Sequence, residues 1–144
     1  MIKLWIDCEF NSGNGNLISL ALVNEDSDRE FYEVVECNQA IDPWVAQNVM
    51  PILEKAPIPY TEFQTRLHKF LKQFPGIQVY ANHPNDFKHL MLAVILTPKD
   101  WMMIQPFTMV LDDAISGKGS KVHHNALHDA RASRDSWMKN NGYL

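Results

Sequence analysis

The chain has 144 residues, of which 46% are hydrophobic and 21% charged, as is usual for an ordinary folded domain. We therefore expect one domain over residues 1–144, large enough to bury a core without disulfides or a structural metal. The net charge of −4 argues against a protein that wraps duplex DNA through many contacts to phosphate. It does not argue against a nuclease that holds phosphate through bound metal ions.

The two cysteines, Cys8 and Cys37, are too few for a disulfide framework or a cysteine-rich zinc site. The first ten residues lack the pattern of a signal peptide, because acidic residues interrupt their apolar run. No apolar segment approaches the 18 or so residues needed to span a bilayer. We therefore expect a cytoplasmic protein that does not engage membranes.

Three strands are predicted at the start of the chain, with short polar connections typical of hairpins: Ile2–Asp7, Leu17–Val23 and Glu30–Val35. Asp42 and Pro43 then predict the start of a helix that runs to Pro51. The later segments predict, in order, a helix from Thr61 to about Phe74, a strand Ile77–Ala81, a helix Asp86–Leu96, a strand Phe107–Leu111 and a helix Asn125–Asn140.

This order of elements predicts an α/β protein with a mixed five-stranded sheet. An antiparallel meander opens the sheet, βαβ crossovers complete it, and helices flank it. The same strand order is typical of the ribonuclease-H-like fold. A fold class does not by itself indicate a function, so the prediction of function depends on particular side chains.

The first of these are Asp7 and Glu9, separated by one residue at the end of the first strand. Side chains alternate along a strand, so both carboxylates point to one face and Cys8 points to the other. Two acids this close repel each other unless positive charge lies between them. A solvated pair of acids at a strand end is the alternative interpretation.

Asp86, His124 and Asp129 complete the candidate set. Asp86 follows the strand Ile77–Ala81, where an aspartate also commonly caps a helix. His124 lies on the loop that enters the last helix, and Asp129 lies about one turn inside it, where a carboxylate is often merely solvated. Together the four acids would offer hard oxygen ligands that suit Mg²⁺ or Mn²⁺ better than zinc. Two such ions would neutralise the acids and enable phosphoryl-transfer chemistry.

Three ordered motifs resemble those of the DEDD superfamily of 3′–5′ exonucleases, in the branch whose fifth residue is histidine. They are D-x-E at Asp7-Cys8-Glu9, an aspartate after the fourth strand in Asn82-His83-Pro84-Asn85-Asp86, and H-x-x-x-x-D from His124 to Asp129. Phe10 replaces the threonine of many relatives, and Asn85 replaces the usual aromatic residue. The chain is most similar to the small single-domain exoribonucleases of the mycobacterial type, with which it shares D-x-E-F and a similar segment from Trp44 to Pro51.

The resemblance implies two-metal-ion hydrolysis of a single-stranded RNA or DNA 3′ end, with RNA favoured, to nucleoside 5′-monophosphates. Asp7, Glu9 and Asp129 would hold one ion, and Asp7 with Asp86 the second. His124 would accept the proton of the attacking water, a role that suits an imidazole. Relatives often form homodimers, so a homodimer is also expected.

Substrate contacts are less determined by the sequence. Phe10 is a candidate for stacking on the terminal base, and Lys121 and Arg131 are candidates for phosphate contacts. Each also has an ordinary interpretation, as a core phenylalanine or as a solvated charge. The alternative function is a ribonuclease-H-like module that binds nucleic acid without cleaving it.

Overall fold

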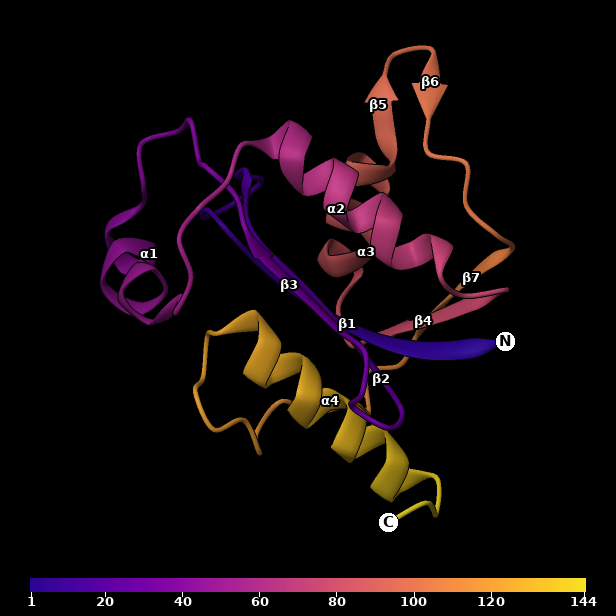
Figure 1. Ribbon diagram of the computed structural model, residues 1–144. Helices are drawn as coiled ribbons and strands as arrows, with labels where there is room; N and C mark the ends of the chain where they lie inside the picture. The colour runs from indigo at the N-terminus through magenta and orange to yellow at the C-terminus, as the bar shows by residue number, and fades with distance from the viewer.

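The computed structural model describes residues 1–144 and contains a mixed five-stranded sheet of order β3-β2-β1-β4-β7 (Figure 1). Its strands are β1 (Ile2–Phe10), β2 (Leu17–Asn24), β3 (Glu30–Val34), β4 (Ile77–Ala81) and β7 (Phe107–Leu111). The first three strands pair antiparallel, and β4 is parallel to both β1 and β7. The predicted α/β class, with an antiparallel opening and parallel crossovers, is confirmed.

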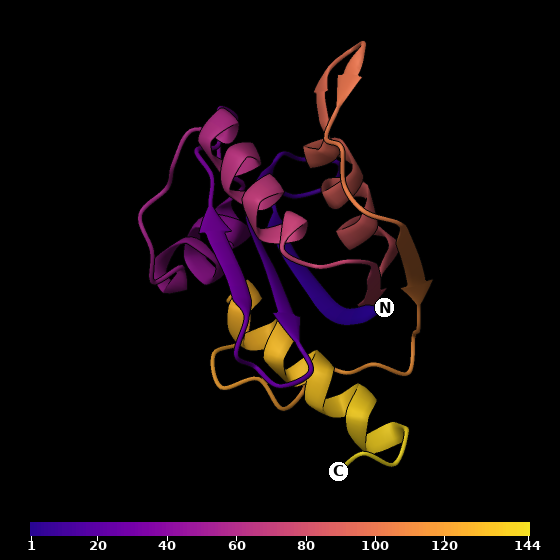
Figure 2. The same cartoon turned by 45° about the vertical axis from the view of Figure 1, so that its right-hand side comes forward.

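Helices cover both faces of this sheet. They are α1 (Pro43–Asn48), α2 (Tyr60–Lys72), α3 (Pro84–Val94) and α4 (Ala126–Asn140), with a 3₁₀ turn η1 at Met50–Ile52. The views agree that α2 and α3 lie over one face and α4 over the other, while α1 packs beyond the ends of β2 and β3 (Figures 1 and 2). None of these helices has both the length and the hydropathy required to cross a membrane.

Alternation along β1 divides its side chains between the two faces. Leu4, Ile6 and Cys8 join a core of 19 buried residues beneath α2 and α3. Trp5 joins a smaller core of eight residues beneath α4. Asp7 lies two residues after Trp5, so its side chain points to the same face of the sheet, toward α4.

β1 is longer than predicted, so both acids lie inside the strand instead of at its end. It pairs with β2 as far as Phe10, but its parallel pairing with β4 stops at Trp5 opposite Tyr80. The carboxyl-terminal half of β1 therefore has a neighbour on one side only. Periodicity within one segment cannot reveal this, since the length of a strand depends on how far its partners extend.

Each of the four helices differs from its predicted range by one to three residues at an end, and α1 and α3 are the clearest cases. The helix expected to reach Pro51 ends at Asn48, and Pro51 lies within η1, where a short 3₁₀ turn tolerates proline at its start. The helix expected over Asp86–Leu96 begins at Pro84 and ends at Val94.

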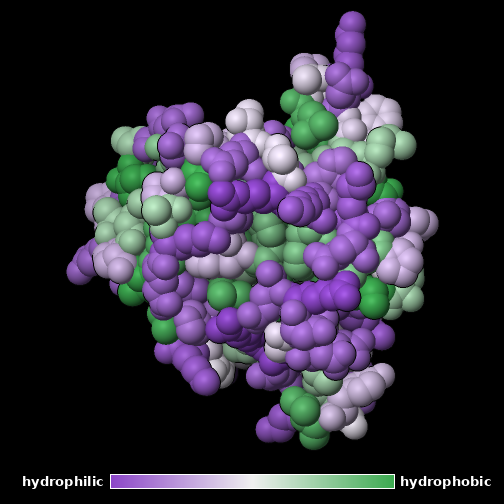
Figure 3. Space-filling model, viewed as in Figure 1, coloured by the Kyte–Doolittle hydropathy of each residue, from purple (hydrophilic) through white to green (hydrophobic).

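The chain after α3 forms a small hairpin that the sequence did not predict. Its strands, β5 (Ile95–Thr97) and β6 (Asp100–Trp101), pair antiparallel and project from the body of the protein (Figures 1 and 2). Ile95 is 50% exposed and Trp101 is 64% exposed. Hydrophobic surface shows at the base of this hairpin on an otherwise largely hydrophilic face (Figure 3).

Candidate metal centre

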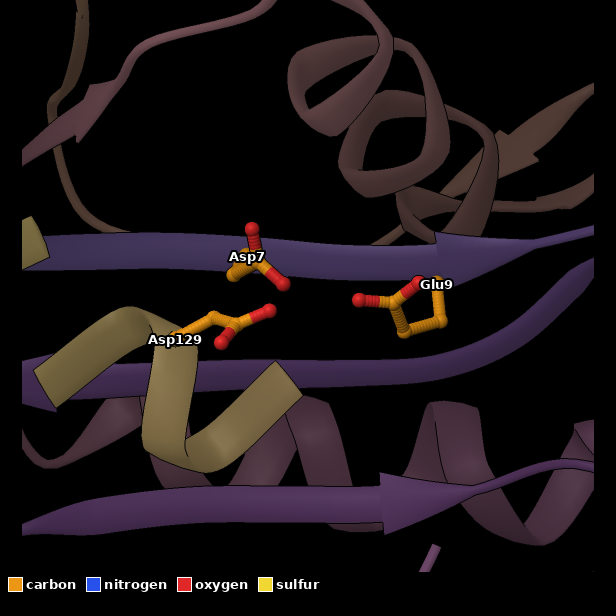
Figure 4. Close-up of side chains that lie close together, drawn as sticks. All are labelled: Asp7, Glu9 and Asp129. Atoms are coloured by element: carbon orange, nitrogen blue, oxygen red, sulfur yellow. The ribbon is translucent and has the colours of Figure 1, made fainter. Parts of the chain in front are cut away.

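Three carboxylates meet between the sheet and α4. Asp7 and Glu9 reach the space from β1, and Asp129 reaches it from the first turn of α4. One oxygen from each lies within 4.8 Å of one oxygen from each of the others. Figure 4 shows the carboxylates of Asp7 and Asp129 facing each other, with that of Glu9 directed toward both. We call these three residues the acidic triad.

The start of α4 determines where Asp129 lies. Asn125 caps the helix, because its side-chain oxygen accepts hydrogen bonds from the N–H groups of Leu127 (3.0 Å) and His128 (3.2 Å). Asp129 therefore falls in the first turn, where the helix dipole favours negative charge. Its Oδ2 accepts a hydrogen bond of 3.1 Å from the backbone N–H of His124.

The acidic triad lacks partners for its charge. Oδ2 of Asp7 and Oδ1 of Asp129 are buried and accept no hydrogen bond. No lysine, arginine or histidine forms an ion pair with any member of the triad. Buried acidic oxygens without partners are costly, because desolvation penalises the ionised form.

The same environment perturbs the acid equilibria of the triad. Burial raises the pKa of Asp7 well above its usual range, and the neighbouring charges of Asp86, Glu9 and Asp129 raise it further. Burial also raises the pKa of Glu9 to about 8, with contributions from Asp129 and Asp86. A divalent cation would offset both shifts by favouring the ionised carboxylates, and the donor set consists entirely of oxygen, which Mg²⁺ and Mn²⁺ prefer.

Asp86 lies beside the acidic triad but outside it. It does not cap α3: His83 does so, since its Nδ1 accepts a hydrogen bond of 3.1 Å from the N–H of Asn85. Oδ1 of Asp86 instead accepts a hydrogen bond of 3.0 Å from the backbone N–H of Cys8, at the part of β1 that extends past β4. Burial raises the pKa of Asp86 to about 7, although the Cys8 N–H bond opposes this. Its Oδ2 makes no hydrogen bond and remains free for a ligand.

His124 adjoins the triad through its backbone, and its ring is not part of the group. Its φ of +72° lies in the left-handed region that non-glycine residues seldom adopt. The imidazole contacts Trp44 edge to face, with ring centroids 5.1 Å apart. Trp44 is 52% exposed. This contact was not predicted from the sequence, since 80 residues separate Trp44 from His124.

The structure gives the three predicted substrate residues different surroundings. Phe10 is half-buried against the larger core, on the side of Cys8, and its ring lies 4.9 Å from that of His89. Arg131 donates two hydrogen bonds to Glu30, of 2.6 and 2.7 Å. Lys121 is exposed on the loop before α4 and lines a small hollow together with Arg131.

Comparison with known proteins adds nothing to these observations: no protein-family model matches the chain, and neither does any curated protein. The chemistry of the site therefore has to be inferred from its geometry. Three carboxylates that pair with no cationic side chain define a candidate site for a hard divalent cation.

Proposed function

We propose that this protein is a metal-dependent 3′–5′ exonuclease with a ribonuclease-H-like fold, which hydrolyses single-stranded nucleic acid to nucleoside 5′-monophosphates. The acidic triad without a compensating cation is the observation that carries the proposal. The order of the sheet, with an antiparallel opening and parallel β4 and β7, supports the fold. RNA is the favoured substrate and DNA the secondary one.

In this proposal Asp7, Glu9 and Asp129 would hold one Mg²⁺ or Mn²⁺ ion. Asp86 and Asp7 would hold the second. The two unpartnered oxygens of the triad support this assignment, since ligand bonds would satisfy them. When bound, such ions lower the pKa of a water nucleophile and offset the negative charge that develops on the scissile phosphate.

His124 is the proposed general base, which takes a proton from the attacking water. Its ring is exposed and has Trp44 at one side, so the imidazole is accessible yet limited in rotation. Its backbone N–H donates a hydrogen bond to Asp129, so the residue itself lies next to the triad. A positioned imidazole is the commonest general base near neutral pH.

The 3′-terminal nucleoside fits a hollow of about 390 Å³ at the end of β1. This hollow is adjacent to Phe10, because Leu17, which pairs with Phe10, and His89, which contacts it, both line the wall. Its polar lining includes amide, hydroxyl and cationic groups and one carboxylate, from Asn14, Asn16, Asn38, Tyr60, Lys88, His89 and Glu36. In the proposal the terminal base stacks on the ring of Phe10, and stacking of this kind accepts any of the bases.

The test is digestion of 5′-labelled single-stranded RNA and DNA of matched sequence, with Mg²⁺, with Mn²⁺ and with a chelator. We expect a ladder that shortens from the 3′ end, release of nucleoside 5′-monophosphates, faster loss of RNA, and no reaction with the chelator. A 3′-phosphorylated RNA should resist, and Asp7→Asn serves as the inactive control.

Three results would contradict the proposal. Binding of RNA without any shortening would favour a non-catalytic binding module. Internal fragments from the 3′-blocked RNA would indicate an endonuclease instead. Full activity in the Asp7→Asn variant would show that the triad is not the site of hydrolysis.

A further inference from the structure

A buried amide connects the start of α4 to the chain around η1. Asn125 is 1% exposed, and its side-chain Nδ2 donates hydrogen bonds to the carbonyls of Ile52 (2.9 Å) and Leu53 (3.4 Å). Its Oδ1 is the acceptor that caps α4. One side chain therefore fixes the first turn of the helix and attaches it to a separate part of the chain, 72 residues away.

Tyr32 extends this connection to the sheet. Its hydroxyl donates a hydrogen bond of 2.6 Å to the carbonyl of Leu53, and Nδ2 of Asn125 lies 3.5 Å from the same hydroxyl. Tyr32 belongs to β3, where it pairs with Ala21 of β2. Ala21 in turn pairs with Asp7, so this polar network lies two strands from the first acid of the triad.

The two site residues of the last motif lie on either side of Asn125. His124 immediately precedes it, and the N–H of Asp129 donates a hydrogen bond of 2.9 Å to the carbonyl of Asn125. The left-handed backbone of His124 requires support from its surroundings. A displacement of Asn125 would move Asp129 and His124 together, relative to the carboxylates on β1.

Helix capping alone does not require asparagine here. Serine, threonine and aspartate cap helices about as well, since each supplies the acceptor for the first N–H groups. A carboxamide accepts from the helix and has two N–H donors, here directed to the carbonyls of Ile52 and Leu53, whereas a carboxylate has no donor and a hydroxyl has one on a shorter side chain. The hydrogen bonds that Asn125 donates to these two carbonyls hold the start of α4 in position over the sheet.

We infer that Asn125 is a positioning residue, whose amide sets the location of Asp129 relative to Asp7 and Glu9 and thereby the affinity of the acidic triad for a divalent cation. This inference rests on the proposed metal site. Groups that orient metal ligands commonly change affinity or activity about 10- to 100-fold when they are removed.

The test compares Asn125→Ser with a matched control, Gln64→Ala. Serine keeps the cap and the net charge but cannot reach Ile52. Gln64 is also a buried amide that donates to two carbonyls, those of Ala93 and Ile95, at 3.0 Å each, but it does so on the opposite face of the sheet. Mn²⁺ binding is measured by calorimetric titration and by electron paramagnetic resonance, next to the melting temperature and the rate of RNA hydrolysis.

We expect both variants to melt at lower temperature, and only Asn125→Ser to bind Mn²⁺ about 10- to 100-fold more weakly. Tyr32→Phe, which keeps Asn125, should weaken binding by a few-fold at most. Equal Mn²⁺ affinity in Asn125→Ser and Gln64→Ala would overturn the inference while leaving the proposed function intact. If the unaltered protein neither binds Mn²⁺ nor shortens RNA, the proposed function is wrong and the inference fails with it.

Discussion

Two groups of acids in this protein have opposite electrostatic surroundings. Glu33 on β3 is 4% exposed, and Lys55 (2.7 Å) and Arg66 (2.9 Å) both pair with it. Glu30 on the same strand pairs with Arg131. The acidic triad, only two strands away, has no cationic partner.

The difference is not a shortage of cations near the triad. Arg131 is two residues from Asp129 on α4, yet its guanidinium pairs with Glu30 and lowers the pKa of that carboxyl. Burial and like charges raise the pKa of Glu9 instead. Glu30 and Glu33 thus have cationic side chains as partners, and the acidic triad has none. This difference is the physical basis for the proposed metal site, where a bound ion would neutralise the charge of the triad.

The largest expected effect comes from removing one charge of the triad. Asp7→Asn or Asp129→Asn should lower the hydrolysis rate at least about 1,000-fold, because a bound metal contributes several kcal/mol to catalysis. The metal-free variants should melt at a higher temperature than the unaltered protein, since the substitution relieves repulsion. Rate assays and calorimetry in a chelator measure the two effects. A lower melting temperature would show that the triad is stabilising without metal.

The stability of the metal-free protein should depend on pH in the sense set by the raised pKa values. Glu9 at about 8 and Asp86 at about 7 hold more protons in the folded chain than in the unfolded one, where acids titrate near 4. The free energy of unfolding should therefore fall from pH 5 to pH 8, by several kcal/mol, as those protons are lost.

Urea denaturation across this pH range measures the slope, and Asp7→Asn should make it shallower. Saturating Mn²⁺ should reverse the trend, because the ion binds ionised carboxylates and stabilises only the folded chain. Stability that rises with pH in the chelator would indicate that the triad already has a compensating charge.

His124 is the proposed general base, and its backbone N–H binds Asp129 of the triad. His124→Ala should slow RNA hydrolysis about 100-fold, as expected for loss of a general base, and leave the Mn²⁺ affinity unchanged. His123→Ala, at the exposed neighbouring histidine, is the matched control and should have normal rates. If His124→Ala changed Mn²⁺ affinity instead of the rate, the imidazole would be acting on the charge of the triad.

Features that depend on local periodicity were predictable from the sequence. The alternation of β1 placed Asp7 and Glu9 on one face and Cys8 on the other, and the predicted last helix, Asn125–Asn140, differs from α4 by one residue at its start. The order of strands and helices was likewise readable from apolar runs and their turn signals. Each of these properties is set within ten or so residues.

Features that depend on pairing between distant segments were not predictable. Asp86 binds the N–H of Cys8 because β4 stops pairing before β1 ends, which neither segment reveals alone. Arg131, predicted to contact phosphate, pairs with Glu30, 101 residues away. The hairpin β5–β6 was missed because its strands have only three and two residues, too few for a recognisable alternation.

The smallest effect, and the one that separates the two groups of acids most directly, is expected from Glu33→Gln. This substitution makes the same chemical change as Asp7→Asn, but it removes the charge that Lys55 and Arg66 neutralise. Both cations are half-exposed and can regain water, so the loss should be only about 1–2 kcal/mol.

Calorimetry in a chelator should therefore give shifts in melting temperature of opposite sign for the two variants. Mn²⁺ affinity should be normal in Glu33→Gln and lost in Asp7→Asn. Shifts of the same sign would mean that charge compensation does not distinguish the triad from the paired glutamates.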